Sequence, residues 1–372
     1  MSFEVKNESI DGSIKCKNCG AALEYQPGTS TLKCPYCGTI NEITTTNDKN
    51  IDSFDYNDFI NSDKLPNNNT TEANIVQCSN CGATTTLAPG ITADKCPFCA
   101  TPLVINTKQT QRILKPHYVL PFIINQPRAI ELYKKWMSKL WFAPDNLVKN
   151  TNETRVNSLK GIYIPYWSYD TDTKTEYVGE QGIYYWVTET YYEEENGEQV
   201  ERTREVRHTN WYSVSGTVHC SFDDILVSAS KSLPQTLANK LEPWTLDRLQ
   251  HYNDQYMSGF QAETYQLAPD ACLETAKQLI NDDILNAIRN DIGGDEQHIT
   301  DYDNQYLNIA IKYELLPIWI SAFYFENKLY QIVINGATGE VIGERPYSTS
   351  KILFAILIGI VVLMILYFCF KN

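Results

Sequence analysis

The sequence predicts an α+β protein with two small four-cysteine zinc ribbons, a mostly antiparallel α+β domain and one C-terminal transmembrane helix. Three observations predict this class. A four-cysteine frame occurs twice, a central region mixes amphipathic helices with β-type runs, and a long stretch without charges follows. The expected units are a first zinc ribbon (13–43), a flexible linker (44–74), a second zinc ribbon (75–105), the α+β domain (112–346) and the transmembrane helix (352–370).

Eight of the 11 cysteines form two copies of the pattern C-x2-C-x14-C-x2-C. Each C-x2-C turn puts two sulfur atoms on one side of a tight knuckle, and two knuckles supply the four tetrahedral thiolates that Zn²⁺ accepts. A unit of about 30 residues cannot bury a self-sufficient core, so the metal supplies folding free energy. We therefore predict two structural zinc ions, held by Cys16, Cys19, Cys34 and Cys37 and by Cys78, Cys81, Cys96 and Cys99.

The alternatives for these frames are a redox motif and a disulfide framework. All four cysteines recur together, which disfavours a redox pair. The N-terminal residues show no basic segment and no apolar segment of a secretory signal, so we expect the reducing cytosol, which disfavours disulfides. Cys220 and Cys272 are expected to be small buried hydrophobic residues, and Cys369, at the membrane edge, is expected to face lipid, with palmitoylation as the alternative.

Residues 44–74 are rich in Asn, Thr and Asp and are predicted to be a flexible linker. Within them, "FDYNDFI" (54–60) leaves open a short helix or a docking segment.

The α+β domain is predicted from five segments. An amphipathic helix covers "PRAIELYKKWMSKLWFAP" (127–144), with a proline in its first turn and another beyond its end. A β-type run covers 161–170, and a long hairpin covers 182–219 with a type I′ turn at Asn196-Gly197. A second helix covers 269–292, and strands separated by turns fill 306–344.

The stretch "ILFAILIGIVVLMILYFCF" (352–370) has no charge and lies between Lys351 and Lys371. As a helix it would be about 28 Å long, close to the hydrocarbon thickness of a bilayer. It also lacks the polar stripe of a core helix. We expect a tail anchor, with the bulk of the chain in the cytoplasm.

Charge and missing motifs narrow the function classes. The chain carries 31 basic and 45 acidic residues, a net charge of −14, and neither ribbon has a basic face, which disfavours nucleic acid. The sequence has no P-loop, no dinucleotide fingerprint, no nucleophile elbow and no HExxH motif, and its five histidines are isolated. No constellation of nucleophile, base or carboxylate pair stands out, so we expect no enzyme.

Several segments occur in an order that resembles a known family. They are "CPYCG", "LPF" (120–122), "KGIYIPYWSYD" (160–170), "LLPIWI" (315–320) and "NGATGEVIGERP" (335–346), followed by the apolar helix. This order resembles bacterial membrane-anchored TFIIB-type zinc-ribbon proteins, often labelled primosomal protein N′ (replication factor Y) or superfamily II helicase. The resemblance implies metal binding by the eight cysteines and an accessory role at the bacterial inner membrane. The helicase label does not carry over, because a helicase needs a P-loop.

The leading expectation is a non-enzymatic adaptor or scaffold that recruits protein partners of unknown identity at the cytosolic membrane face. The alternative is a nucleic-acid-binding protein linked to replication or transcription. An enzyme acting from the α+β domain is the third reading.

Overall fold

The computed structural model describes residues 14–43, 50–61, 70–86, 93–104, 109–144, 159–195 and 198–371. Its largest part is a nine-stranded sheet with three long strands, β11 (Lys160–Glu195), β12 (Glu198–Ser228) and β15 (Glu296–Phe325). β11 pairs antiparallel with both of its long neighbours. The chain is therefore a strand-rich α+β protein, as the sequence predicts.

Short strands complete this sheet around the order β12-β11-β15-β10-β13. Two of the pairings are parallel, β10 with β15 and β14 with β11, and the others are antiparallel. The short strands are β4 (Phe54–Asp55), β10 (Tyr118–Val119), β13 (Gln250–His251), β14 (Gln261–Ala262), β16 (Lys328–Asn335) and β17 (Val341–Gly343).

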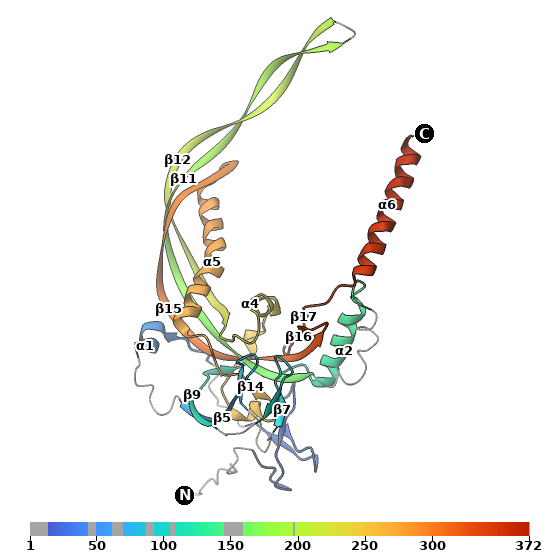
Figure 1. Cartoon of the computed structure of the whole chain (residues 1–372). Helices are drawn as coiled ribbons and strands as arrows, with labels where there is room; N and C mark the ends of the chain where they lie inside the picture. Colours follow the sequence, from blue (N-terminus) through green and yellow to red (C-terminus); the bar gives the residue numbers. More distant parts are fainter. Residues whose placement is uncertain are drawn as a thin grey trace.

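Two amphipathic helices pack on this sheet. The helix predicted over 269–292 has those bounds, whereas the helix predicted over 127–144 already ends at Ser138. α2 (Gln126–Ser138) is capped by Asn125, whose side chain accepts a hydrogen bond from the Arg128 N–H. α5 (Pro269–Ile292) lies along the β11–β12 hairpin (Figure 1) and buries an isoleucine stripe there. Shorter helical turns follow β12: α4 (Gln235–Ala238), η3 (Asn239–Leu241), η4 (Leu246–Arg248) and η5 (Asp254–Met257).

β11 and β12 form a hairpin whose outer part projects from the body as a two-stranded arm (Figure 1). The last described pair is Glu195 with Glu198, and the predicted turn at Asn196-Gly197 lies outside the described residues. β15 accompanies β11 only as far as Gly182. Beyond that point β11 and β12 pair only with each other in the sheet, although Tyr184 still donates hydrogen bonds to Asp295 and Glu296. The arm exposes aromatic rings such as Trp186, which is 62% exposed.

α6 (Thr349–Lys371) contains the predicted apolar helix. It is long and apolar enough to cross a membrane, and none of its apolar stretch is buried inside the protein. That exposure argues against a core helix, because a core helix would cover such a surface.

The part of 44–74 that the structure describes is ordered rather than a flexible linker. β4 pairs with β15, and α1 (Tyr56–Asn61) follows it directly. The Phe59 ring packs against Trp167 with 5.8 Å between centroids. Residues 70–74 belong to β5 (Thr70–Gln77), so this strand crosses the predicted boundary between the linker and the second ribbon. Aromatic residues scattered through a polar segment supply these contacts. The polar composition of the segment therefore does not reveal that it is ordered.

Each cysteine unit carries its own small sheets. The first contains β1 (Glu24–Tyr25), β2 (Thr31–Lys33) and β3 (Ile40–Glu42), in that order. The second combines β6 (Thr84–Thr86), β5 and β9 (Gln109–Leu114) with a separate pair, β7 (Ala93–Lys95) and β8 (Pro102–Val104).

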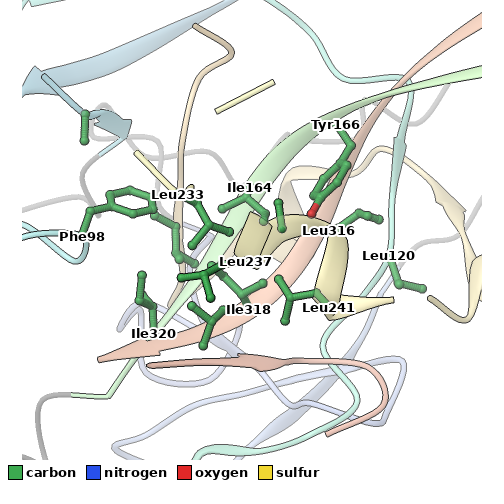
Figure 2. Packing of buried hydrophobic residues seen from close by; sticks show 14 of the residues in the cluster. Phe98, Leu120, Ile164, Tyr166, Leu233, Leu237, Leu241, Leu316, Ile318 and Ile320 are labelled. Atoms are coloured by element: carbon green, nitrogen blue, oxygen red, sulfur yellow. The ribbon is translucent and has the colours of Figure 1, made fainter. Parts of the chain in front are cut away.

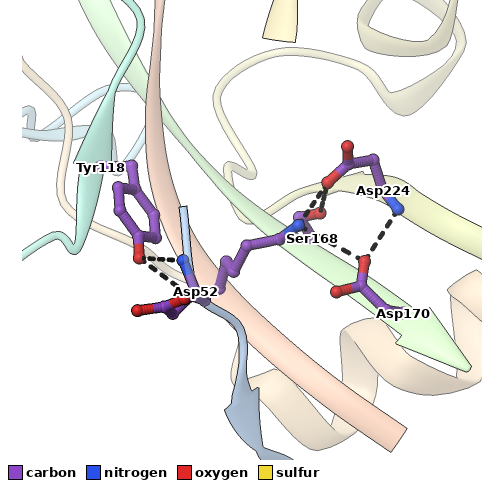
Figure 3. A network of polar contacts seen from close by, with 6 residues as sticks. Asp52, Tyr118, Ser168, Asp170 and Asp224 are labelled. Atoms are coloured by element: carbon purple, nitrogen blue, oxygen red, sulfur yellow. Dashed lines mark hydrogen bonds and ion pairs between the residues drawn. The ribbon is translucent and has the colours of Figure 1, made fainter. Parts of the chain in front are cut away.

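A buried charge network lies on the face of β15. Lys312 is 6% exposed, and its ammonium pairs with the carboxylates of Asp170, at 3.4 Å, and Asp224. Figure 3 shows Ser168, Asp170 and Asp224 converging at this point, where the Ser168 hydroxyl donates to Asp224. Glu314, two residues along the strand, is fully buried, and among the described residues neither of its carboxylate oxygens has a hydrogen-bond partner. Burial raises the pKa of Glu314 to about 8.

Candidate metal centres

The four C-x2-C knuckles share one backbone conformation. In the first knuckle the Cys16 N–H donates to the Ala21 carbonyl and the Gly20 N–H donates back to the Cys16 carbonyl. The same pair of hydrogen bonds recurs at Cys34, Cys78 and Cys96. The residue after the second cysteine has positive φ in every knuckle, and it is Gly20, Gly38, Gly82 or Ala100. Glycine thus occupies three of the four positions that need left-handed backbone.

These knuckles bring the eight predicted cysteines together in two groups of four. We call Cys16, Cys19, Cys34 and Cys37 the first tetrad, and Cys78, Cys81, Cys96 and Cys99 the second tetrad. Within each tetrad all sulfur atoms lie within 4.8 Å of one another, and the short sulfur–sulfur distances are 3.5 and 3.6 Å. A tetrahedral ion with bonds of about 2.3 Å would place its sulfur ligands about 3.8 Å apart. Each tetrad therefore fits its own metal ion of the size and softness of Zn²⁺.

A threonine next to each tetrad favours the thiolate form of one ligand. The Thr39 hydroxyl lies 3.1 Å from the Cys37 sulfur, and the hydroxyl and N–H of Thr39 lower the pKa of Cys37 to about 5. Burial acts to raise the pKa of Cys99, but the hydroxyl and N–H of Thr101, together with the side chains of Asn80 and Cys81, lower that pKa to about 6. Such hydrogen bonds to a ligand sulfur are typical of metal–thiolate sites. The sequence reading missed both threonines, although each follows its cysteine by two residues.

The second cysteine unit is docked on the body of the protein at many points. The Asp94 carboxylate forms an ion pair with Lys160 of β11 and accepts from the Gln261 side chain at 3.0 Å. The Gln266 side chain donates to the Gly82 carbonyl at 3.0 Å. The cysteines at 78, 96 and 99 also belong to the core cluster that contains Ile162 and Ile318. This unit is therefore an integral part of the folded body.

The first cysteine unit contacts the body through its hairpin. The Tyr25 N–H donates to the Ser258 carbonyl at 2.9 Å, and the Ser258 hydroxyl donates to the Leu23 carbonyl at 2.8 Å. The Gly28 N–H donates to the Phe122 carbonyl. Its tetrad is more open, since two of its cysteines are exposed against one in the second tetrad. The first unit is thus held at its hairpin while part of its metal centre faces solvent.

The remaining cysteines lie outside both tetrads. Cys272 is buried in α5 among apolar side chains, as the sequence predicts, and burial raises its pKa to about 12. Cys220 is half-buried on β12, and Cys369 is exposed on α6.

Comparisons with known proteins give one clear similarity. No family model matches the chain, and no solved structure matches it. The chain is similar to a protein of Bacillus subtilis (strain 168) described as "Uncharacterized protein YdjG", with 26% identity over 341 residues. The similarity covers 91% of this chain and 92% of that protein, so it extends over nearly the whole length of both. The description of that relative states no activity.

Proposed function

We propose that this chain is a membrane-anchored, non-enzymatic adaptor that binds two structural zinc ions and recruits protein partners at the cytosolic face of the membrane. The observation that carries the proposal is the pair of closed four-sulfur tetrads in a chain that ends in an exposed apolar helix. A metal ion with four thiolate ligands has no open coordination position, so it stabilises a fold and does not activate a substrate. This role also agrees with the resemblance to membrane-anchored TFIIB-type zinc-ribbon proteins.

The arrangement of the molecule supports a recruiting role. α6 and the first cysteine unit lie at opposite ends of the protein (Figure 1). With α6 in the bacterial inner membrane, the first unit would be presented away from the lipid surface. Burial raises the pKa values of Glu314 and Glu263, and both side chains are enclosed in the protein. Their burial favours a structural role over a catalytic one.

The test uses the full chain purified from membranes. We expect two zinc ions per chain by elemental analysis, and flotation with lipid vesicles that is lost when residues 349–371 are removed. Chemical cross-linking in native membranes should recover partner proteins that Cys37→Ser loses and Cys220→Ser, a cysteine outside both tetrads, retains. An unchanged set of partners in Cys37→Ser would show that the first unit does not recruit them.

The alternative is nucleic-acid binding, and Lys15, Lys17 and Lys33 in the first unit are the residues that favour it. Single-stranded DNA on a column separates the two functions. Retention of the full chain that falls steeply with salt would support the alternative, and passage near physiological salt would support the adaptor.

A further inference from the structure

The two cysteine units place an aromatic ring at the same point of the same knuckle. The second knuckle reads Cys34-Pro-Tyr-Cys in the first unit and Cys96-Pro-Phe-Cys in the second, so Tyr36 and Phe98 are equivalent. The knuckles share their closing hydrogen bonds, from the N–H of Cys34 to Thr39 and from the N–H of Cys96 to Thr101. Because the backbone hydrogen bonds are the same, the Cα–Cβ bonds of Tyr36 and Phe98 start from equivalent positions of their knuckles. What differs is the surface that receives it.

The body of the protein receives the ring of Phe98. This residue is 1% exposed, and Figure 2 shows its ring pointing into the cluster that contains Leu233. The side-chain amide of Gln331 on β16 donates to the Phe98 carbonyl at 2.8 Å and to the Ser232 carbonyl at 3.3 Å. The receiving surface thus combines an apolar pocket for the ring with an amide donor for the carbonyl of the same residue.

The ring of Tyr36 is left in solvent. Tyr36 is 83% exposed, and Ile40, just past the same knuckle, is 65% exposed. The unit is held to the body at the opposite part of its hairpin, around Tyr25 and Gly28, so this knuckle faces outward. The first unit lies on the side of the body opposite to α6 (Figure 1, blue).

We propose that the Tyr36 knuckle docks into a protein partner whose surface offers an apolar pocket for the ring and a side-chain amide for the Tyr36 carbonyl. The chain itself supplies the template, because Phe98 is bound in this way by the body. This inference rests on the proposed adaptor function and deepens it by naming the contact. Tyrosine suits the role, since it gives a large apolar area at low entropic cost and is enriched among residues that dominate interfaces.

Other occupants fit the structure of this knuckle less well. A lipid surface would have to lie at the end opposite to α6. Four thiolates and one Zn²⁺ carry a net charge of −2, so the metal centre beside Tyr36 would repel the phosphates of a nucleic acid. A second copy of the chain offers the pocket that Phe98 already fills.

The experiment places the photoreactive residue benzoylphenylalanine at position 36 of the full chain in native membranes, with the same residue at Lys17 on the first knuckle as a matched control. Cross-linked peptides are then read by mass spectrometry. We expect cross-links from position 36 to one peptide of another protein that carries apolar residues with an Asn or Gln. Cross-links to nucleic acid, to lipid or to another copy of this chain, or no cross-links, would overturn the proposal.

Two variants test the contact without the photoreactive group. With the chemical cross-linker, Tyr36→Phe should keep the captured partner, and Tyr36→Ser should lose it by about tenfold or more. Both should still hold two zinc ions, because Tyr36 is not a ligand, and this zinc content excludes simple unfolding. If Cys37→Ser loses the partner and Tyr36→Ser keeps it, the adaptor stands and this contact is refuted. If neither variant loses it, both ideas fail.

Discussion

Gly38 and Ala100 close equivalent knuckles with the same left-handed backbone, at φ 72° and φ 58°. A Cβ atom added at Gly38 would meet nothing within 4 Å, so the position restricts only the backbone. This conformation costs a residue with a Cβ atom about 1–2 kcal/mol, and it costs glycine little. The second unit therefore carries a small strain that the first unit avoids.

We expect Ala100→Gly to stabilise the second unit by about 1 kcal/mol, and Gly38→Ala to destabilise the first by a similar amount. Thermal unfolding of the zinc-loaded full chain in detergent, followed together with zinc release, measures both. Gly38 is exposed and its surroundings leave room for a methyl group, so Gly38→Ala tests the backbone alone, whereas Ala100 is half-buried. A lower stability for Ala100→Gly would show that the alanine methyl makes a contact worth more than its backbone strain.

The two metal centres should lose zinc in a fixed order. Cys19 and Cys37 are exposed in the first tetrad, whereas three of the four ligands in the second are buried within the body. A chelator must reach the ion through local opening, and an opening is easier where fewer contacts are broken. We expect two phases of release, the faster one from the first tetrad by at least a few-fold. An indicator dye can follow them, and Cys37→Ser should remove the fast phase while Cys99→Ser removes the slow one.

Much of this architecture could be predicted from local patterns. The cysteine spacing and the proline and glycine that bound α5 each act within a few residues, so the sequence shows them directly. α5 runs over 269–292 as predicted. The eight cysteines of the two tetrads were predicted for the same reason.

The rest depends on contacts between distant residues. The docking of the second unit needs Lys160, Gln261 and Gln331, which lie far from the tetrad in sequence. The repeated cysteine frame also gives no sign that Tyr36 is exposed while Phe98 is buried. Their burial depends on the surface that faces each ring. The pairing of β4 with β15 likewise involves only two residues on the shorter strand. No local pattern distinguishes such a segment from a linker.

The arm should be dispensable for folding. The hydrogen bonds, ion pairs and ring contacts that we describe for residues 188–205 join one strand of the arm to the other, such as Arg204 with Glu189 at 3.1 Å. Replacing 188–205 by Asn-Gly would close the hairpin directly after the pair of Val187 with Val206. We expect the thermal midpoint and the zinc content of the full chain to stay unchanged. A clear fall in either would mean that the arm also supports the body.

Glu314 should make the protein less stable as the pH rises. Its pKa is about 8 in the folded chain, because burial disfavours the charged carboxylate, against an ordinary value of 4.5. Between these values the folded state binds more protons than the unfolded state, so unfolding becomes easier as pH rises. Glu263 acts in the same direction, since burial raises its pKa to about 7. Stability contributed by the neutral carboxyls is thus present near pH 5 and is lost towards pH 8.

Glu314→Gln isolates this effect, because the amide has nearly the same shape and cannot ionise. We expect thermal midpoints of the variant and the wild type to agree near pH 5 and to diverge towards pH 8, where the variant should be more stable by about 1–3 kcal/mol. Glu344→Gln, at an exposed position, is the matched control and should follow the wild type at every pH. Parallel curves for Glu314→Gln and the wild type would mean that the Glu314 carboxyl finds an ionic partner in the folded protein, and Lys312 would be the first candidate, since its charge acts to lower the pKa of Glu314.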